Sequence, residues 1–150
     1  MSFKLSQRSL DKLEGVHPDM VKCVTSAINY SKVDFGVICG MRSEAEQREL
    51  VQKGASKTMK SKHLIGHAVD LMAYVGSRAS WELNLYDDIA DAMKKACINQ
   101  GKRVTWGAAW QTELNKWNGT SEELMNAYID LRRSEGRRPF IDGPHFQLEI

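Results

Sequence analysis

The spacing of apolar and polar positions along the chain predicts five helices. The clearest lies at residues 17–30, where apolar side chains recur at intervals of three and four residues and so share one helical face. Those positions are Met20, Val21, Val24, Ala27 and Ile28. Pro18 suits the first turn of this helix, because a backbone N–H would have no helical partner there. Capping residues and terminal glycines predict the other helices, at residues 6–14, 43–53, 85–100 and 121–134.

Short runs rich in β-branched and aromatic residues predict four strands, at residues 33–39, 67–74, 103–106 and 144–149. These strands do not alternate with the helices in a regular βαβ order. We therefore expect an α+β fold, in which helices pack on a small, largely antiparallel sheet. The chain has 150 residues and contains no internal repeat or linker-like tract, so we expect a single domain over residues 1–150.

The composition excludes several classes of protein. Hydrophobic residues make up 42% and charged residues 27% of the chain, which is typical of a folded globular protein. The net charge of +2 gives little support to nucleic-acid binding. No run approaches the roughly 20 apolar residues of a membrane span, and the first residues lack the apolar core of a secretory signal. We therefore expect a protein that folds in a cytoplasm and does not insert into a membrane.

The three cysteines favour the same compartment. Cys23, Cys39 and Cys97 are odd in number and contain no C-x-x-C spacing, so they predict neither a disulfide framework nor a zinc knuckle. Each lies among apolar residues, and we expect all three to be small core side chains.

Two polar clusters contain three of the four histidines and predict a metal site. The sequence SKHLIGHAVD contains His63 and Asp70, and the sequence DGPH contains His145. A catalytic zinc ion takes three nitrogen or oxygen ligands and leaves one position open for water. His63, Asp70 and His145 would supply two imidazoles and one carboxylate. Gly66 lets the chain turn between His63 and the strand that contains Asp70.

Asp142 is the candidate general base. It precedes His145 by three residues, and in a regular strand the two side chains would face opposite ways. Gly143 and Pro144 make a regular strand unfavourable, so the chain can bend and bring both groups to one site. There, Asp142 would take a proton from water beside the metal and pass it to the leaving amine.

These motifs resemble the two signatures of the D-Ala-D-Ala carboxypeptidase and dipeptidase family of zinc peptidases. That family shares its fold with lysostaphin-type peptidases and the hedgehog signalling domain. Residues 13–19 (LEGVHPD) and the pair Trp106-Gly107 are similar to the L-alanyl-D-glutamate endopeptidase branch, which includes many phage endolysins. Residues 40–47 (GMRSEAEQ) resemble the family's G-[YF]-R-S-x-x-x-Q segment, with Met41 in place of the usual aromatic residue.

The resemblance implies a single zinc peptidase domain of the hedgehog/DD-peptidase type. It implies that His63, Asp70 and His145 bind Zn²⁺ and that Asp142 is first the general base and then the general acid. It implies that Arg42 holds the substrate carbonyl or stabilises its oxyanion. The bond cut would be L-Ala–D-Glu in the peptidoglycan stem. The short endolysins lack the charged helical segment around residues 111–139, so we expect an insertion there.

The same resemblance implies a biological setting. An endolysin without a signal peptide accumulates in the host cytoplasm and reaches the cell wall after release by a holin. Peptidoglycan would be the partner, with no nucleic acid and no membrane insertion, and a monomer needs no extra assumption. Two other functions stay open: a D,D-carboxypeptidase that removes terminal D-Ala, and a non-catalytic zinc-containing module that binds the wall.

The sequence alone allows two interpretations of the role of several residues. The Ser61 hydroxyl could orient a metal ligand or cap the local turn. Trp106 could line the substrate cleft or fill the core. His17 and His67 are expected not to bind metal. The basic pairs at residues 132–133 and 137–138 could form a solvated helix face or attract an anionic wall polymer.

Overall fold

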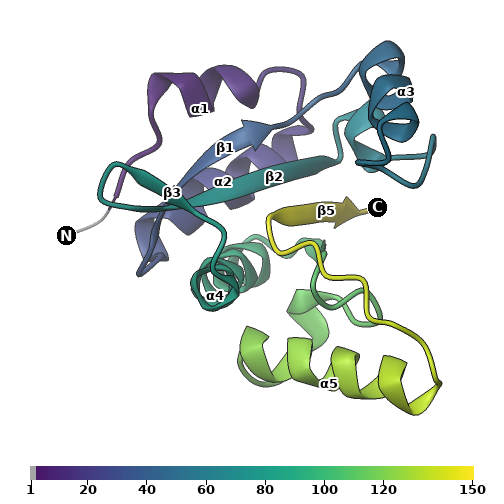
Figure 1. Cartoon of the computed structure of the whole chain (residues 1–150). Helices are drawn as coiled ribbons and strands as arrows, with labels where there is room; N and C mark the ends of the chain where they lie inside the picture. Colours follow the sequence, from purple (N-terminus) through teal and green to yellow (C-terminus); the bar gives the residue numbers. More distant parts are fainter. Residues whose placement is uncertain (1–2) are drawn as a thin grey trace.

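Antiparallel strands form the central sheet of the computed structural model, which describes residues 3–150 (Figure 1). The strands are β1 (Asp34–Cys39), β2 (Ala68–Val75), β3 (Arg78–Ser80), β4 (Arg103–Trp106) and β5 (His145–Glu149). Their order is β1-β2-β5-β4, and β3 pairs with the outer part of β2. The last strand in the sequence is therefore inserted between two earlier ones, so the centre of the sheet is built from distant parts of the chain.

The helices surround this sheet and confirm the expected α+β class (Figure 1). They are α1 (Gln7–Lys12), α2 (Pro18–Tyr30), α3 (Glu44–Gln52), α4 (Leu83–Asn99) and α5 (Ser121–Ser134). The amphipathic helices α2 and α4 pack against each other and against the sheet, and their apolar faces make up much of the core. α5 packs on α4 and lies on the side of the molecule away from α1 (Figure 1).

The helix starts follow the local sequence signals. His17 precedes α2, and its Nδ1 accepts a hydrogen bond from the Asp19 backbone N–H at 3.1 Å, so its expected structural role has a physical basis. Capping boxes begin α3 and α5, where Ser43 and Thr120 exchange hydrogen bonds with the third helical residue. α1 ends at Lys12, two residues earlier than expected. None of the helices within residues 3–150 is both long and apolar enough to cross a membrane.

Three short elements were not predicted. β3 and the 3₁₀ helix η2 (Leu114–Lys116) span 3 residues each, and the 3₁₀ helix η1 (Lys62–Ile65) spans 4. Such short segments complete too little of a helical or strand period to leave a pattern in the sequence.

The cysteines divide into two groups. Cys23 and Cys97 are fully buried between α2 and α4, as expected. Cys39 is not a core residue: it ends β1, is only partly buried and faces polar groups. The register between β1 and β2 shifts between Val37 and Cys39, and this irregularity brings Cys39 opposite Asp70.

Candidate active site

Strand register brings the predicted ligands together. Asp70 on β2 is paired with His145 on β5, and on its other side with Cys39 on β1. His63 comes from η1, just before β2. The distance from Asp70 Oδ1 to His63 Nε2 is 3.3 Å and to His145 Nδ1 is 3.4 Å. One carboxylate oxygen thus faces a nitrogen from each imidazole, and we call these three residues the ligand cluster.

A short capped turn holds His63. The Ser61 hydroxyl accepts a hydrogen bond from the His63 backbone N–H at 3.2 Å, so Ser61 caps the turn while also lining the adjoining cleft. The turn ends at Gly66, whose φ of +72° lies in the left-handed region. A Cβ at Gly66 would also lie 2.5 Å from the Gly15 carbonyl oxygen, so this position is restricted to glycine.

The tautomer of His63 follows from its contacts. Its Nδ1 lies 2.8 Å from the carbonyl oxygen of Gly40, which can only accept, so Nδ1 carries a proton and donates it. In the neutral imidazole, Nε2 then presents a lone pair to Asp70. Burial alone would lower the pKa of His63, but the hydrogen bonds and charges of Asp70 and Cys39 raise it to about 10.

Hydrogen bonds through the side chains of Gln147 and Glu149 fix the tautomer of His145 as well. The Gln147 amide nitrogen donates to Glu149 Oε1 at 2.8 Å, so its oxygen faces His145 Nε2 at 2.9 Å and accepts from it. His145 Nδ1 is therefore left with a lone pair toward Asp70. Burial would raise the pKa of Asp70, but the adjacent imidazoles of His145 and His63, when protonated, hold it well below its usual range.

This donor set fits a metal ion. His63 Nε2 and Asp70 Oδ1 are buried, and neither has a hydrogen-bond partner within residues 3–150. With neutral imidazoles, two nitrogen lone pairs face one carboxylate oxygen, and acceptors so arranged require a shared cation, either a proton or a metal. Two imidazoles and a carboxylate are the nitrogen and oxygen donors that zinc takes in catalytic sites.

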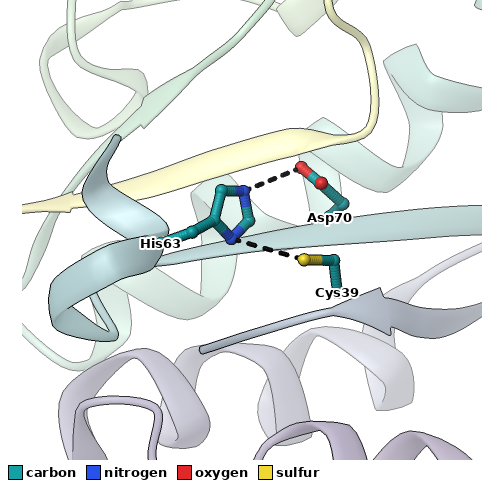
Figure 2. Close-up of side chains that lie close together, drawn as sticks. All are labelled: Cys39, His63 and Asp70. Atoms are coloured by element: carbon teal, nitrogen blue, oxygen red, sulfur yellow. Dashed lines mark hydrogen bonds and ion pairs between the residues drawn. The ribbon is translucent and has the colours of Figure 1, made fainter. Parts of the chain in front are cut away.

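Cys39 lies on the other side of the His63 ring (Figure 2). Donor atoms of Cys39, His63 and Asp70 lie within 4.8 Å of one another, so the three could also be considered a metal site. The Cys39 sulfur, however, faces Nδ1 at 3.8 Å, whereas Asp70 faces Nε2. Because Nδ1 donates to Gly40, its lone pair is not free for a metal. Cys39 therefore lies next to the ligand cluster, on the Nδ1 side of the His63 ring, and is not part of it. Burial alone would raise the pKa of the Cys39 thiol, but His63 lowers it.

Asp142 joins the cluster from the loop before β5. Donor atoms of Asp142, Asp70 and His145 lie within 4.8 Å of one another, so the bend expected at Gly143-Pro144 does bring Asp142 and His145 together. Burial raises the pKa of Asp142, and the negative charge of Asp70 acts in the same direction. A carboxylate with a raised pKa is better suited to accept a proton near neutral pH.

The Asp142 loop is held by the end of β4. Trp106 is fully buried, and its indole N–H donates to the Gly143 carbonyl at 2.7 Å, so it fills the core instead of lining the cleft. Gly107 accepts a hydrogen bond from the Asp142 N–H at 2.8 Å and donates to the His145 carbonyl at 2.7 Å. A Cβ at Gly107 would lie 2.3 Å from the Asp142 carbonyl oxygen. The Trp-Gly pair thus positions the Asp142 loop through close backbone contact.

A cleft with a volume of about 570 Å³ opens beside these groups. Asp142 and the ligand cluster line it, together with residues of the 54–62 segment and the aromatic side chains of Trp110 and Phe140. The Trp110 and His145 ring centroids are 5.3 Å apart, so an aromatic surface adjoins the ligand cluster. The cleft therefore has room for an extended peptide across the buried polar groups.

A family model described as phage L-alanyl-D-glutamate peptidase matches residues 1–149 of the chain. The chain belongs to this family. The L-alanyl-D-glutamate peptidase of Escherichia phage T5 is 30% identical over 152 aligned residues, which cover 99% of each protein. The crystal structure of the Serratia marcescens L-Ala D-Glu endopeptidase ChiX is similar with a TM-score of 0.76 and 38% identity, over 99% of this chain and 91% of that one.

Membership of the phage L-alanyl-D-glutamate peptidases confirms the main expectations from sequence. The resemblance to an endolysin-type peptidase, the enzyme class and the α+β fold are all confirmed. The roles of the individual site residues, the identity of the metal and the insertion at residues 111–139 are not tested by these likenesses and stay predictions.

Arg42 of this peptidase is held at the edge of the site. Its guanidinium donates to Gln47 Oε1 at 2.6 Å and to the Cys39 sulfur at 3.3 Å, and it lies 3.5 Å from Asp70 Oδ2. Gln47 is fully buried and donates in turn to the Thr58 carbonyl at 2.6 Å. Arg42 lines the cleft, and one N–H of each terminal guanidinium nitrogen is already engaged by this network.

The sequence analysis missed several residues around the site of this peptidase. Gln147 follows His145 by two residues, so strand alternation already placed both on one face of the sheet. Gln47 entered the sequence analysis only as the last residue of the segment at residues 40–47. Trp110 and Cys39 left no signal, because their positions depend on a loop path and on a strand irregularity.

Proposed function

We propose that this peptidase hydrolyses the L-Ala–D-Glu bond of peptidoglycan with a zinc ion held by His63, Asp70 and His145. The observation that supports this most directly is the pair of imidazole nitrogens turned toward one buried carboxylate oxygen, next to Asp142. Bound there, zinc would supply Lewis acidity, which polarises a carbonyl group and lowers the pKa of water from 15.7 to about 7.

The residues of the chain perform the remaining chemistry. Asp142 accepts a proton from the attacking water and then donates it to the nitrogen of the departing D-Glu. Its burial favours the protonated form, so the carboxyl group holds the proton long enough to deliver it. Trp106 and Gly107 keep the Asp142 loop in register with His145.

Arg42 stabilises the negative charge that develops on the carbonyl oxygen of L-Ala. Its guanidinium is permanently charged and lines the cleft beside Asp70. When a metal neutralises Asp70, the attraction between Arg42 and that carboxylate weakens, and the guanidinium can turn toward substrate. Gln47 limits this movement to a short distance.

The phage relatives support a biological setting for this proposal. The chain acts as an endolysin: it is made in the host cytoplasm, reaches the wall after holin-dependent release and works there as a monomer on peptidoglycan. The segment at residues 111–139 is an insertion that borders the substrate cleft.

Mass spectrometry of digested Gram-negative peptidoglycan tests this proposal. The purified protein is compared with a sample treated with a chelator and with the same sample after zinc is restored. We expect soluble peptides that begin with D-Glu, L-Ala left on the glycan, and loss and recovery of both with the metal. Release of free D-Ala would instead identify a D,D-carboxypeptidase. Wall binding without new amino termini would identify a non-catalytic module.

A further inference from the structure

A second hollow adjoins the catalytic cleft and is not used by the proposed chemistry. It has a volume of about 510 Å³ and lies between the C-terminal half of α5 and the segment that follows it. We call it the arginine groove. Its main lining residues are Trp110, Tyr128, Leu131, Arg132, Arg137 and Phe140. Trp110 and Phe140 line the catalytic cleft as well, so the groove and the cleft share one wall.

Trp110 and Phe140 form the wall between the two hollows, and stacking and hydrogen bonds hold both residues in place. The rings of Trp110 and Phe140 are stacked, with centroids 6.0 Å apart. Trp110 Nε1 donates to the Phe140 carbonyl at 3.1 Å, and the Phe140 N–H donates to the Tyr128 hydroxyl at 3.2 Å. A ligand that crosses this wall would therefore meet a fixed aromatic surface.

The groove is positively charged. Arg132 and Arg137 line it, and Glu135 is the one acidic side chain among its lining residues. None of the ion pairs found in the described part of the chain involves either arginine. Arg132 donates from Nε and one Nη to the Arg138 carbonyl at 3.2 and 3.0 Å, which fixes the side chain but leaves its charge uncompensated. Such a groove favours an anionic ligand.

The chemistry of the substrate supplies anions on one side of the scissile bond only. D-Glu has two carboxyl groups, and only one of them can continue the peptide, so the other stays free. A carboxylate also ends the peptide beyond D-Glu. The carboxyl group of L-Ala, by contrast, is consumed in the scissile bond. A different hollow, lined by Trp81, Tyr86 and Asp142, lies beside the Asp142 loop and has no cationic side chain among its lining residues.

We propose that the arginine groove binds the carboxylate-bearing peptide that continues beyond D-Glu, with Arg132 and Arg137 as its anion-binding residues. This inference rests on the proposed function, because it takes the substrate of that reaction as the ligand. The inference also gives the orientation of the substrate in the cleft. The peptide beyond D-Glu crosses the Trp110–Phe140 wall, and the substrate on the L-Ala side of the scissile bond leaves the cleft elsewhere.

Steady-state kinetics on three synthetic substrates test the inference. The short substrate is N-acetyl-L-Ala–D-Glu. The long acidic substrate extends it beyond D-Glu with residues that carry carboxylates, and the long neutral substrate carries primary amides in their place. In the Arg132→Gln/Arg137→Gln variant, we expect KM for the long acidic substrate to rise about tenfold with kcat unchanged. The short and long neutral substrates should show no change, and added salt should shrink the difference.

Matched variants separate this role from general charge and from folding. Arg133→Gln removes the same charge from an exposed position of α5 outside the groove, and we expect it to leave all three substrates unaffected. Arg137→Gln alone tests the groove without disturbing the Arg132–Arg138 contact. Unchanged activity on the short substrate shows that each variant is folded.

Three outcomes would overturn the inference. A KM that rises equally for the long neutral substrate would show that carboxylates are not bound there. An equal effect in Arg133→Gln would show only a long-range effect of charge. If the wild-type protein cleaves none of the three substrates, the proposed function itself has failed, whereas cleavage with no change in the variants rejects the groove alone.

Discussion

The sheet that carries the ligand cluster and the α5 region, residues 110–140, are built in contrasting ways. In the sheet, Asp70 and His145 are opposite each other in paired strands, and one ring nitrogen of each histidine, His63 Nδ1 and His145 Nε2, has a defined hydrogen-bond partner. The α5 region is attached through side chains, with Phe140 45% exposed and the Lys57 ammonium 5.0 Å from the centre of its ring.

Buried polar atoms without hydrogen-bond partners reveal the same contrast. Within residues 3–150 they are His63 Nε2, Asp70 Oδ1, Asp87 Oδ1 and Ser121 Oγ. The first two belong to the ligand cluster, where a metal would satisfy them. The other two lie where α4 meets α5, where no ligand chemistry is expected. The unsatisfied groups of the sheet thus lie where a ligand would bind, whereas those between α4 and α5 carry a cost in stability. This difference suggests that chemistry is fixed by the sheet and substrate selection by the α5 region.

The largest effect is expected from Asp142→Asn, which removes the proton acceptor and keeps the shape of the loop. We expect kcat/KM to fall about 10³-fold, a typical contribution of general acid–base catalysis. Zinc content and melting temperature should stay near the wild-type values, as measured by elemental analysis and by calorimetry. Full lytic activity in this variant would rule out the assigned role.

A smaller effect is expected from Gln147→Leu, which removes the acceptor for His145 Nε2. Loss of such an orienting partner typically weakens metal binding by about 10- to 100-fold. A competition titration with a zinc chelator measures this directly. Glu149→Gln, which alters only the outer end of the chain of contacts, is the control and should have a weaker effect. Equal zinc affinity in Gln147→Leu and wild type would argue against His145 as a ligand.

Gly107→Ala tests the backbone clamp on the Asp142 loop. The added Cβ would lie 2.3 Å from the Asp142 carbonyl oxygen, so the loop must move. We expect a loss of about 2 kcal/mol in unfolding free energy, together with reduced activity. Gly143→Ala is the matched control, since its Cβ would meet only side-chain atoms at 3.3 Å or more. Denaturant titration compares the two, and equal stabilities would contradict the clamp.

The smallest effect is expected where α4 packs against α5, from Asp87→Asn on α4. Burial, and then the charges of Glu122, Asp91 and Asp88, raise the pKa of Asp87 to about 6. An unfolded aspartate titrates near 3.9, so between these values the folded state binds the extra proton. This group therefore adds stability as pH falls from about 7 to about 4.

Removing that carboxylate should stabilise the protein at neutral pH. We expect Asp87→Asn to raise the unfolding free energy by about 1–2 kcal/mol at pH 7, with little gain at pH 4. Thermal unfolding at the two pH values provides the measurement. Asp88→Asn, on the same helix, is the control with the same change in charge. A variant that is less stable than wild type at pH 7 would show that Asp87 has an essential partner.

Much of the fold could be predicted because its main elements have local signals. α2 and α5 have caps and apolar periodicity, and the structure places them within a residue of the expected bounds. The proximity of Asp142 to His145 was predictable from Gly143-Pro144, which breaks the strand. Trp106 could not be assigned, since an indole in a short strand suits either a core or a cleft. Cys39 was misplaced in the core because the irregularity at the end of β1 depends on pairing with β2.

The position of β5 has a consequence for the nascent protein. β5 is synthesised after every other strand, yet it completes the centre of the sheet and brings both His145 and the Asp142 loop to the site. A partly made chain therefore has His63 and Asp70 but lacks the proposed third ligand and the proposed proton acceptor. Contacts between such distant segments form late in folding. During synthesis the site thus stays incomplete until β5 has been made and has paired with β2 and β4.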